Sequence, residues 1–279
     1  SAPMAKNPTK SSDPTGSSDV SEVLIDYGGG VFPGAPQLAP DGTGVYVELG
    51  LEDAWYQCET AAGRIDRIDL TTGTATPVAE GSSPQLSPDG VRLAYVASSR
   101  CVPSGDNELE VIAYADTLAV LVLVTGRVLR WQPSPGVRES PVSVIDSLAW
   151  TADGTAIFVA MADGTLRLVD LTVGAALDAT PEIGSGRTEA VFGAWILEGI
   201  DGATGRLVAV EWDYELVTSR VVEINPATGR VVAADPLIDG FAVLRLDATG
   251  TERILTVDGR LVTPAGTFGP DPFYGGADW

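Results

Sequence analysis

The sequence predicts an all-β fold, a β-propeller of four-stranded antiparallel blades. Three observations predict it. One hairpin sequence recurs along the chain, a second strand pair with a glycine-containing turn follows each copy, and helix-forming stretches are scarce. The repeating unit is about 40–50 residues long, which is the length expected of one propeller blade.

The hairpin is clearest in PQLSPDGVRLAYVAS, residues 84–98. Pro88 sets φ for the first central turn position, Asp89 can bond nearby backbone, and Gly90 supplies the left-handed conformation. The residues after the turn are mostly apolar at both alternating positions, as is typical of a strand covered on both faces. We therefore expect two antiparallel strands inside a stack of sheets.

Further copies set the expected number of blades. A near-copy, PQLAPDGTGVYVELG, lies at 36–50, a third copy lies at 147–161, and degenerate copies lie at 197–212 and 244–259. The downstream strand pairs are clearest at 64–79, 165–177 and 220–234, and 120–133 is the same unit with a more apolar beginning. Five copies predict five blades, with six as the alternative because the second and third Asp-Gly turns are far apart.

The two ends of the chain suggest how the ring closes. After RLVTPAGTF (260–268) no fourth strand is obvious, while EVLIDYGG (22–29) is a strand with no partner before it. We expect this N-terminal strand to complete the last blade, which would remove two free sheet edges. Residues 1–20 are rich in Ser, Pro and Thr and predict a disordered linker or stalk, so the propeller domain is expected over 21–279.

The segment Ser87-Pro88-Asp89-Gly90 with Leu93-Ala94-Tyr95-Val96 resembles the repeats of TolB-like β-propellers. The copies at 39–42 and 151–154 match that motif with one or two changes, and the last two keep little beyond Asp and Gly. The resemblance implies the fold and a habit of binding other proteins, but no single activity. Similar propellers occur in extracytoplasmic actinobacterial proteins, and the use of arginine alone as the base after Lys10 agrees with a high-GC genome.

The charge of the chain excludes some partners. The net charge is −21 and the sequence pI is about 4.1, with acidic residues scattered along the chain. No cluster of Lys and Arg is present to neutralise phosphates, so neither nucleic acid nor an anionic membrane is an expected partner. The longest apolar run, 118–124, is too short to insert into a bilayer. We expect a monomer.

The only two cysteines, Cys58 and Cys101, fall in equivalent connections of neighbouring repeats. Such connections lie side by side on one face of a propeller, so the two thiols are placed to form a disulfide, with two free thiols as the alternative. A disulfide implies an oxidising compartment, and hence an extracytoplasmic protein that is secreted or tethered to the envelope.

Catalytic and metal chemistry have little support. The chain has no histidine, which excludes Ser-His-Asp and Cys-His catalysis and most transition-metal sites, and we expect no cofactor and no metal. Asp41, Asp89 and Asp153 are interpreted as turn formers. Carboxylate-only glycoside hydrolysis is the alternative, but the expected channel strands offer only Asp146 and Glu198.

Binding is the favoured function, and loop length suggests where it occurs. The connections between second and third strands are long at 50–63 and 98–107, tight at 160–165, and intermediate at 211–219. Exposed aromatic and charged residues on such loops are typical of a recognition surface. The candidate binding residues are Glu52, Asp53, Trp55, Tyr56, Arg100, Trp212, Asp213 and Tyr214.

Two alternatives stay open at this point. Trp55 and Trp212 can instead pack under their own loops, while Trp131, Trp150 and Trp195 lie in strand contexts typical of a core. The favoured function is a non-catalytic extracytoplasmic propeller that binds a protein or glycan partner, as the sensor or adaptor part of a tethered envelope protein. A carbohydrate-active hydrolase is the alternative.

Overall fold

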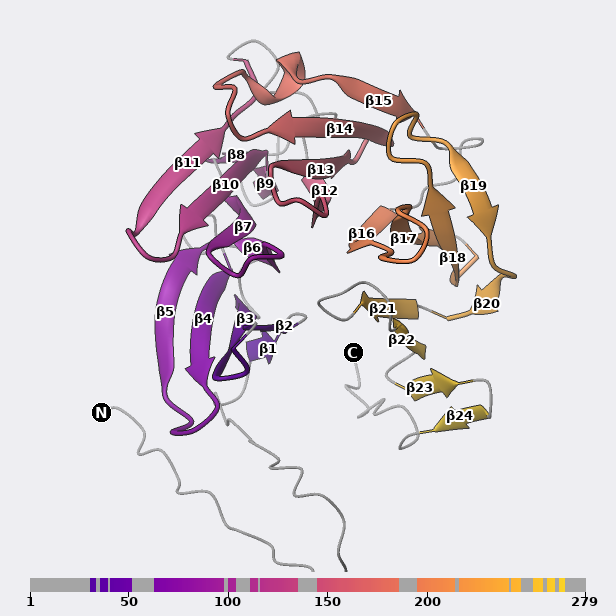
Figure 1. The fold of residues 1–279 in the computed structure, drawn as a ribbon, viewed down its shortest axis with the longest axis horizontal. Helices are drawn as coiled ribbons and strands as arrows, with labels where there is room; N and C mark the ends of the chain where they lie inside the picture. Colours follow the sequence, from indigo (N-terminus) through magenta and orange to yellow (C-terminus); the bar gives the residue numbers. More distant parts are fainter. Residues whose placement is uncertain are drawn as a thin grey trace, which may run out of the picture.

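The computed structural model describes residues 31–33, 36–39, 41–51, 63–97, 100–103, 111–114, 116–134, 145–185, 195–213, 216–240, 242–246, 253–257, 260–263 and 266–268. Within these residues the chain is built from antiparallel strands, with one short 3₁₀ helix at Leu177–Ala179. The sheets follow one another in chain order around a ring (Figure 1). The predicted all-β propeller is confirmed.

Four of the described sheets are complete four-stranded blades, in which the paired strands follow chain order. Blade I contains β6 (Ser82–Leu86), β7 (Arg92–Ala97), β10 (Thr117–Val122) and β11 (Arg127–Trp131). Blade II contains β12 (Ile145–Trp150), β13 (Ala156–Met161), β14 (Thr165–Asp170) and β15 (Glu182–Ser185). Blade III contains β16 (Trp195–Ile200), β17 (Leu207–Asp213), β18 (Thr218–Ile224) and β19 (Val231–Ala234), with β20 (Ile238–Asp239) added beside β18. Blade IV contains β21 (Ala242–Leu246), β22 (Arg253–Val257), β23 (Arg260–Thr263) and β24 (Gly266–Phe268).

The sheet before blade I, here called the N-terminal sheet, is built differently. Its full strands are β3 (Gly44–Leu51), β4 (Arg64–Asp69) and β5 (Ala75–Glu80). The inner edge of β3 is covered by two separate short strands, β1 (Val31–Pro33) and β2 (Gln37–Leu38). The broken inner strand distinguishes this sheet from the four complete blades.

The predicted blade count of five or six is therefore wrong, since the described residues form four blades of four-stranded sheets. The predicted closure is also wrong, because blade IV forms its fourth strand from its own sequence. No fourth strand was expected after residues 260–268, but this segment itself contains the paired strands β23 and β24. The segment 22–29 that was expected to close the ring, and the predicted linker over 1–20, lie outside the described residues, and the division into linker and propeller stays a prediction.

The core lies between the sheets, because most strands bury side chains on both faces. All six residues of β13 are buried, as are five of the six in β7. The largest cluster joins blades I and II and includes Leu118, Leu148 and Ile157, each with no exposed surface. This two-sided burial is what the apolar residues after the Asp-Gly turns predict.

Buried serines tie neighbouring blades together. Ser147 Oγ, on β12, donates to the carbonyl of Trp195 at 2.5 Å and accepts the N–H of Leu197 at 2.9 Å. Ser219, on β18, likewise donates to the carbonyl of Gly240 and accepts the N–H of Ala242. Each hydroxyl thereby satisfies a backbone donor and a backbone acceptor at a junction between sheets.

A carboxylate ties the N-terminal sheet to blade I. Glu48, on β3, accepts the backbone N–H of Ser83 at 2.8 Å, and Ser83 has a positive φ of 52°. Burial raises the pKa of Glu48, while the Ser83 N–H lowers it by a smaller amount. The folded state thus binds this proton more tightly than the unfolded chain does. The resulting contribution to stability is present below the ordinary glutamate pKa, near 4.5, and is lost as the pH rises through the raised pKa.

We therefore expect Glu48→Gln to raise the free energy of unfolding at pH 7, because the amide is neutral and its oxygen can still accept the Ser83 N–H. Urea unfolding between pH 3.5 and 8 measures this effect. The gain should vanish at the acidic end, where both side chains are neutral. Exposed Glu182→Gln is the matched control, and an equal response of both variants would contradict the assignment.

Candidate functional site

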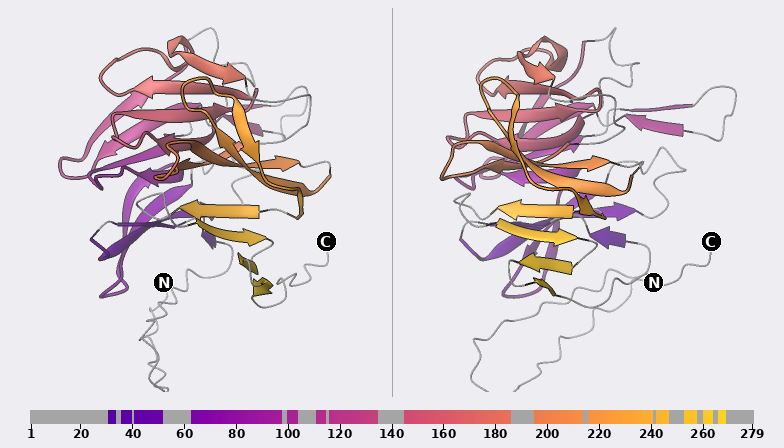
Figure 2. Two further views of the ribbon diagram at one scale, coloured as in Figure 1. Left: turned by 45° about the vertical axis from the view of Figure 1, so that its right-hand side comes forward. Right: turned by 90° about the vertical axis from the view of Figure 1, so that its right-hand side faces the viewer.

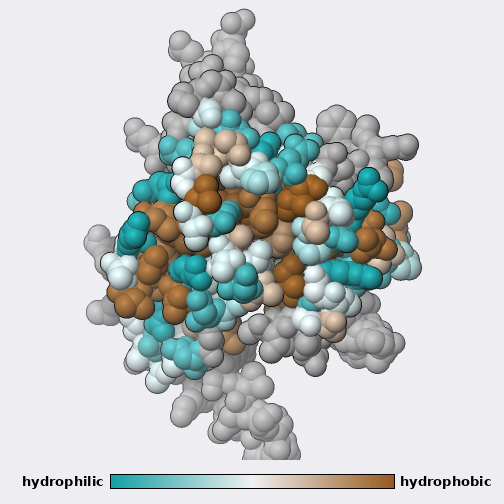
Figure 3. All heavy atoms as spheres, turned by 45° about the horizontal axis from the view of Figure 1, so that its top comes forward, coloured by the Kyte–Doolittle hydropathy of each residue, from teal (hydrophilic) through white to brown (hydrophobic). Residues whose placement is uncertain are grey.

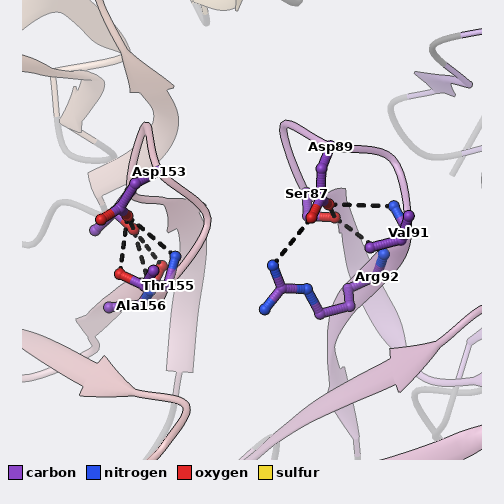
Figure 4. Close-up of polar contacts among 8 residues, drawn as sticks. Ser87, Asp89, Val91, Arg92, Asp153, Thr155 and Ala156 are labelled. Carbon is purple, nitrogen blue, oxygen red and sulfur yellow. Dashed lines mark hydrogen bonds and ion pairs between the residues drawn. The ribbon is translucent and has the colours of Figure 1, made fainter.

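One end of the blades, here called the turn face, carries the Asp-Gly turns, and their carboxylates hold backbone in place. Asp89 Oδ1 accepts the Ser87 hydroxyl at 2.6 Å and the Val91 N–H at 3.2 Å. Asp153 Oδ1 accepts the N–H and hydroxyl of Thr155, and Figure 4 shows the two turns together. The hydrogen bond from the Thr155 N–H, with those from nearby hydroxyls, lowers the pKa of Asp153.

Asp41 repeats this arrangement by accepting the N–H of Thr43 at 2.9 Å, a bond that lowers the pKa of Asp41. The interpretation of Asp41, Asp89 and Asp153 as turn formers is confirmed. Such a carboxylate is committed to closing its own hairpin, and the turns are alike from sheet to sheet. The turn face therefore offers little variation for recognition.

The opposite end of the blades, here called the loop face, carries an inserted hairpin. Strands β8 (Arg100–Pro103) and β9 (Val111–Tyr114) lie between β7 and β10 in the chain and pair only with each other among the described strands. Figure 2 (right) shows this magenta hairpin projecting from the body of the ring. The sequence predicted a long loop here and missed the hairpin. The signal was present, since two runs containing β-branched residues flank the polar stretch SGDNELE (104–110).

The loop face holds some of the predicted binding and disulfide residues. Arg100 and Cys101 lie on β8, where Cys101 is paired in register with Ala113, whereas Trp212 and Asp213 end β17 in blade III. The sequence thus placed these two groups on different blades of one face. The remaining predicted residues, Glu52, Asp53, Trp55, Tyr56, Cys58 and Tyr214, lie outside the described residues.

Trp212 has a packing role that the sequence left open. Its side chain is partly buried against the cluster between blades III and IV, and its indole N–H donates to the carbonyl of Ala242 at 2.7 Å. Asp213 Oδ1 accepts the N–H of Leu216 at 3.0 Å and so shapes the turn between β17 and β18. A role of either residue in binding stays a prediction.

Asp116 is a loop-face residue that sequence reasoning did not single out. It precedes β10 and is fully buried. Its Oδ1 accepts the Thr117 hydroxyl at 2.9 Å, while Oδ2 has no hydrogen-bond partner within the described part of the chain. A buried carboxylate oxygen is normally satisfied by a donor from protein, water or a bound molecule. No periodic or motif signal could have identified it.

The inner strands contain the two carboxylates considered for hydrolysis. Asp146 lies on β12 and Glu198 on β16, two strands that contact each other, and both side chains are partly buried. Within the described ranges, no group of three or more Cys, Asp and Glu side chains is placed to hold a metal ion. Among the described residues, the hydrolase alternative depends on the two carboxylates considered from the sequence, Asp146 and Glu198.

Three further tryptophans among the described residues belong to the core. Trp131, Trp150 and Trp195 are each at most 5% exposed, which confirms their predicted core positions. Figure 3 shows one face of the molecule, where apolar side chains (brown) reach the surface in groups separated by polar ones (teal). Scattered apolar exposure is normal for a folded protein and does not by itself mark a site.

Across the described residues, no helix has the length and apolar character needed to cross a membrane.

No protein-family model matches the chain, and no curated protein matches its sequence. Solved structures do match. Hydrazine synthase of Kuenenia stuttgartiensis superposes with a TM-score of 0.54 at 14% identity, over 86% of this chain and 59% of that one. The Cps50 (Swd1) beta-propeller domain of Myceliophteria thermophila superposes with a TM-score of 0.50 at 14% identity, over 90% of this chain and 70% of that one.

The chain is a β-propeller. At 14% identity the likeness to solved structures concerns the fold alone. The TolB-like type and the actinobacterial origin stay predictions.

Proposed function

We propose that this propeller is a non-catalytic, extracytoplasmic binding module that holds a protein or glycan partner on its loop face. The observation that carries the proposal is the β8–β9 hairpin, which projects from the ring on that face (Figure 2). Repeat proteins commonly place specificity where the repeat is interrupted.

The contrast between blades supports the loop face as the recognition surface. In blade II the equivalent connection is a tight turn in which Asp163 accepts the N–H of Thr165 at 2.8 Å. Blade I carries a whole hairpin at that position, and blade III carries exposed Leu216 and Val217. The loop face therefore varies strongly between blades, as a surface that recognises one partner requires.

The proposal is tested by site-specific photo-crosslinking. A photoreactive residue in place of Arg100 samples the loop face, and the same residue in place of exposed Thr72 samples the turn face as a matched control. We expect adducts with extract proteins, or labelled glycans, from position 100 only. Adducts from both positions alike, or from position 72 alone, would exclude the loop face as the binding surface.

The extracytoplasmic location depends on the thiols. The proposal includes a Cys58–Cys101 disulfide, which would link the β8 strand to the connection after β3. The loop it closes is about forty residues, so its loss by Cys58→Ser with Cys101→Ser should cost on the order of 3–4 kcal/mol. Peptide mapping by non-reducing mass spectrometry detects the linkage directly. Two free thiols in protein produced under oxidising conditions would contradict both the disulfide and the location.

A further inference from the structure

The outer edge of blade III is an open strand edge. Strands β19 and β20 both lie along the same side of β18, with Ala234 opposite Val222 and Ile238 opposite Ser219. Among the described strands, neither pairs with any strand other than β18. Their outward N–H and C=O groups therefore form a row that another extended chain can pair with.

This edge lacks the protection seen on the outer strands of the N-terminal sheet and of blades I and II. Strand β5 contains Pro77 and Glu80, β11 contains Arg127 and Arg130, and β15 begins with Glu182. Strand β19 reads Val-Val-Ala-Ala, with the last three residues exposed and Val232 49% exposed. Charges and prolines on edge strands hinder pairing with other chains. Strand β19 contains neither, whereas Pro236 and Asp239 follow it, so the part of the edge that is competent for pairing is β19 itself.

Apolar side chains extend the edge toward the loop face. Leu237, just before β20, is 63% exposed, and Leu216, in the turn before β18, is 68% exposed. Val217 is held in the same place because its carbonyl accepts the N–H of Gly240 at 2.9 Å. Val217 also has a φ of 52°, which is rare for a β-branched residue and fixes this turn in one backbone conformation. The blade III edge comprises Val231–Ala234, Leu216, Val217 and Leu237.

The charges around the blade III edge indicate its partner. Asp235 and Asp239 are exposed at the end of the edge where the apolar residues gather, whereas Arg230 is exposed at its far end. The nearby bases are already paired with carboxylates of blade III, Arg220 with Glu211 and Arg206 with Glu223. A second copy of this chain carries the same net charge of −21, so the two copies would repel each other overall.

We propose that the blade III edge binds an extended segment of another protein that alternates apolar and basic residues, by strand addition to β19. The main-chain hydrogen bonds supply affinity, the apolar residues cover the edge, and the basic residues meet Asp235 and Asp239. This surface lies on the rim of the propeller and does not depend on the proposed function of the loop face.

The backbone register defines a specific test. The N–H of Asp235 donates to the carbonyl of Val221, so residue 235 bonds toward β18. Since successive residues of a strand point their N–H groups to opposite sides, the N–H of Ala234 points away from β18. Ala234→Pro therefore removes a donor from the open edge and none from the blade. Ala234→Val keeps the N–H and is the matched control.

The probes are a labelled decapeptide of alternating valine and lysine and its counterpart of valine and glutamate, with affinity measured by fluorescence anisotropy. We expect the lysine peptide to bind the wild type at least about tenfold more tightly than the glutamate peptide, and Ala234→Pro to abolish that preference. Ala234→Val should bind as the wild type does, and all variants should melt at similar temperatures. Equal affinity for the two peptides, or undiminished binding by Ala234→Pro, would overturn the proposal.

A second variant and a second measurement complete the test. Val232→Lys serves as the test variant if Ala234→Pro does not fold. It leaves the backbone intact and adds a positive charge to the edge, so it should weaken binding of the lysine peptide. Unchanged binding of the lysine peptide to a folded Val232→Lys would count against the proposal. Sedimentation should show a wild-type monomer, and a dimer that Ala234→Pro dissociates would assign the edge to a second copy of the chain and overturn the basic partner.

Discussion

Replacing Trp150 by alanine should lower the free energy of unfolding by about 3–5 kcal/mol, the cost of removing a large buried aromatic side chain. Trp150 ends β12 in blade II, is 5% exposed, and packs in the cluster between blades I and II. Its indole N–H donates to the carbonyl of Gln85 on β6 at 2.9 Å. The guanidinium of Arg92 lies 5.2 Å from the centre of its ring. One side chain thus joins two blades through packing, a hydrogen bond and a cation–π contact.

Two control variants separate these contributions. Trp150→Phe keeps most of the apolar area but removes the indole hydrogen bond to the Gln85 carbonyl, so a loss of about 1–3 kcal/mol is expected. Val124→Ala removes an apolar side chain that is 84% exposed and should change stability by less than about 0.5 kcal/mol. Urea unfolding of the three variants measures the differences. A loss in Trp150→Ala no larger than in Val124→Ala would show that the blades are not joined at this residue.

Local chemistry explains which parts of the fold the sequence could predict. The turns at Asp89 and Asp153 are specified by residues within five positions, because the carboxylate, the glycine and the preceding hydroxyl close the hairpin among themselves. The strands after them are long enough for their apolar pattern to be read. Trp131 could be assigned to the core because it ends a strand, β11, that the sequence pattern indicated.

The number of blades could not be predicted because it depends on short strands, in which too few residues alternate for an apolar pattern to be recognised. Strands β1, β2, β23 and β24 are two to four residues long, so the broken inner edge of the N-terminal sheet and the final hairpin left no pattern. The expected closure by residues 22–29 followed from the apparent absence of a fourth strand, which β24 supplies. The error therefore came from non-local pairing and not from turn chemistry.

In the candidate site, too, local features could be predicted from the sequence and non-local contacts could not. Loop length correctly indicated the connection after β7 as exceptional, but its division into β8 and β9 required knowledge of pairing. The acceptor of the Trp212 N–H lies thirty residues further along the chain, at Ala242. The burial of Asp116 depends on how β10 sits in blade I. Neither the Trp212–Ala242 hydrogen bond nor the burial of Asp116 could be anticipated from neighbouring residues.

Gly81→Ala should be the most damaging single-methyl addition at the junction of the N-terminal sheet and blade I. The N–H of Gly81 donates to the carbonyl of Gly63 at 2.6 Å, and its φ is +152°, which side-chain-bearing residues rarely adopt. A Cβ there would lie 2.5 Å from the carbonyl oxygen of Val96 and 2.6 Å from Cδ2 of Tyr95. Both residues are buried in β7, so neither can move without disturbing blade I.

We expect Gly81→Ala to lower the free energy of unfolding by about 2–4 kcal/mol, through overpacking and backbone strain together. Two other glycines separate these causes. Gly73 has a φ of +69° with nothing within 4 Å of a Cβ, so Gly73→Ala should cost only about 1–2 kcal/mol of backbone strain. Gly174 has neither a positive φ nor a close neighbour, and Gly174→Ala should be neutral within about 0.5 kcal/mol. If Gly81→Ala costs no more than Gly73→Ala, the close approach of β7 to the crossing from β5 to β6 contributes nothing to stability, and strain alone explains the glycine.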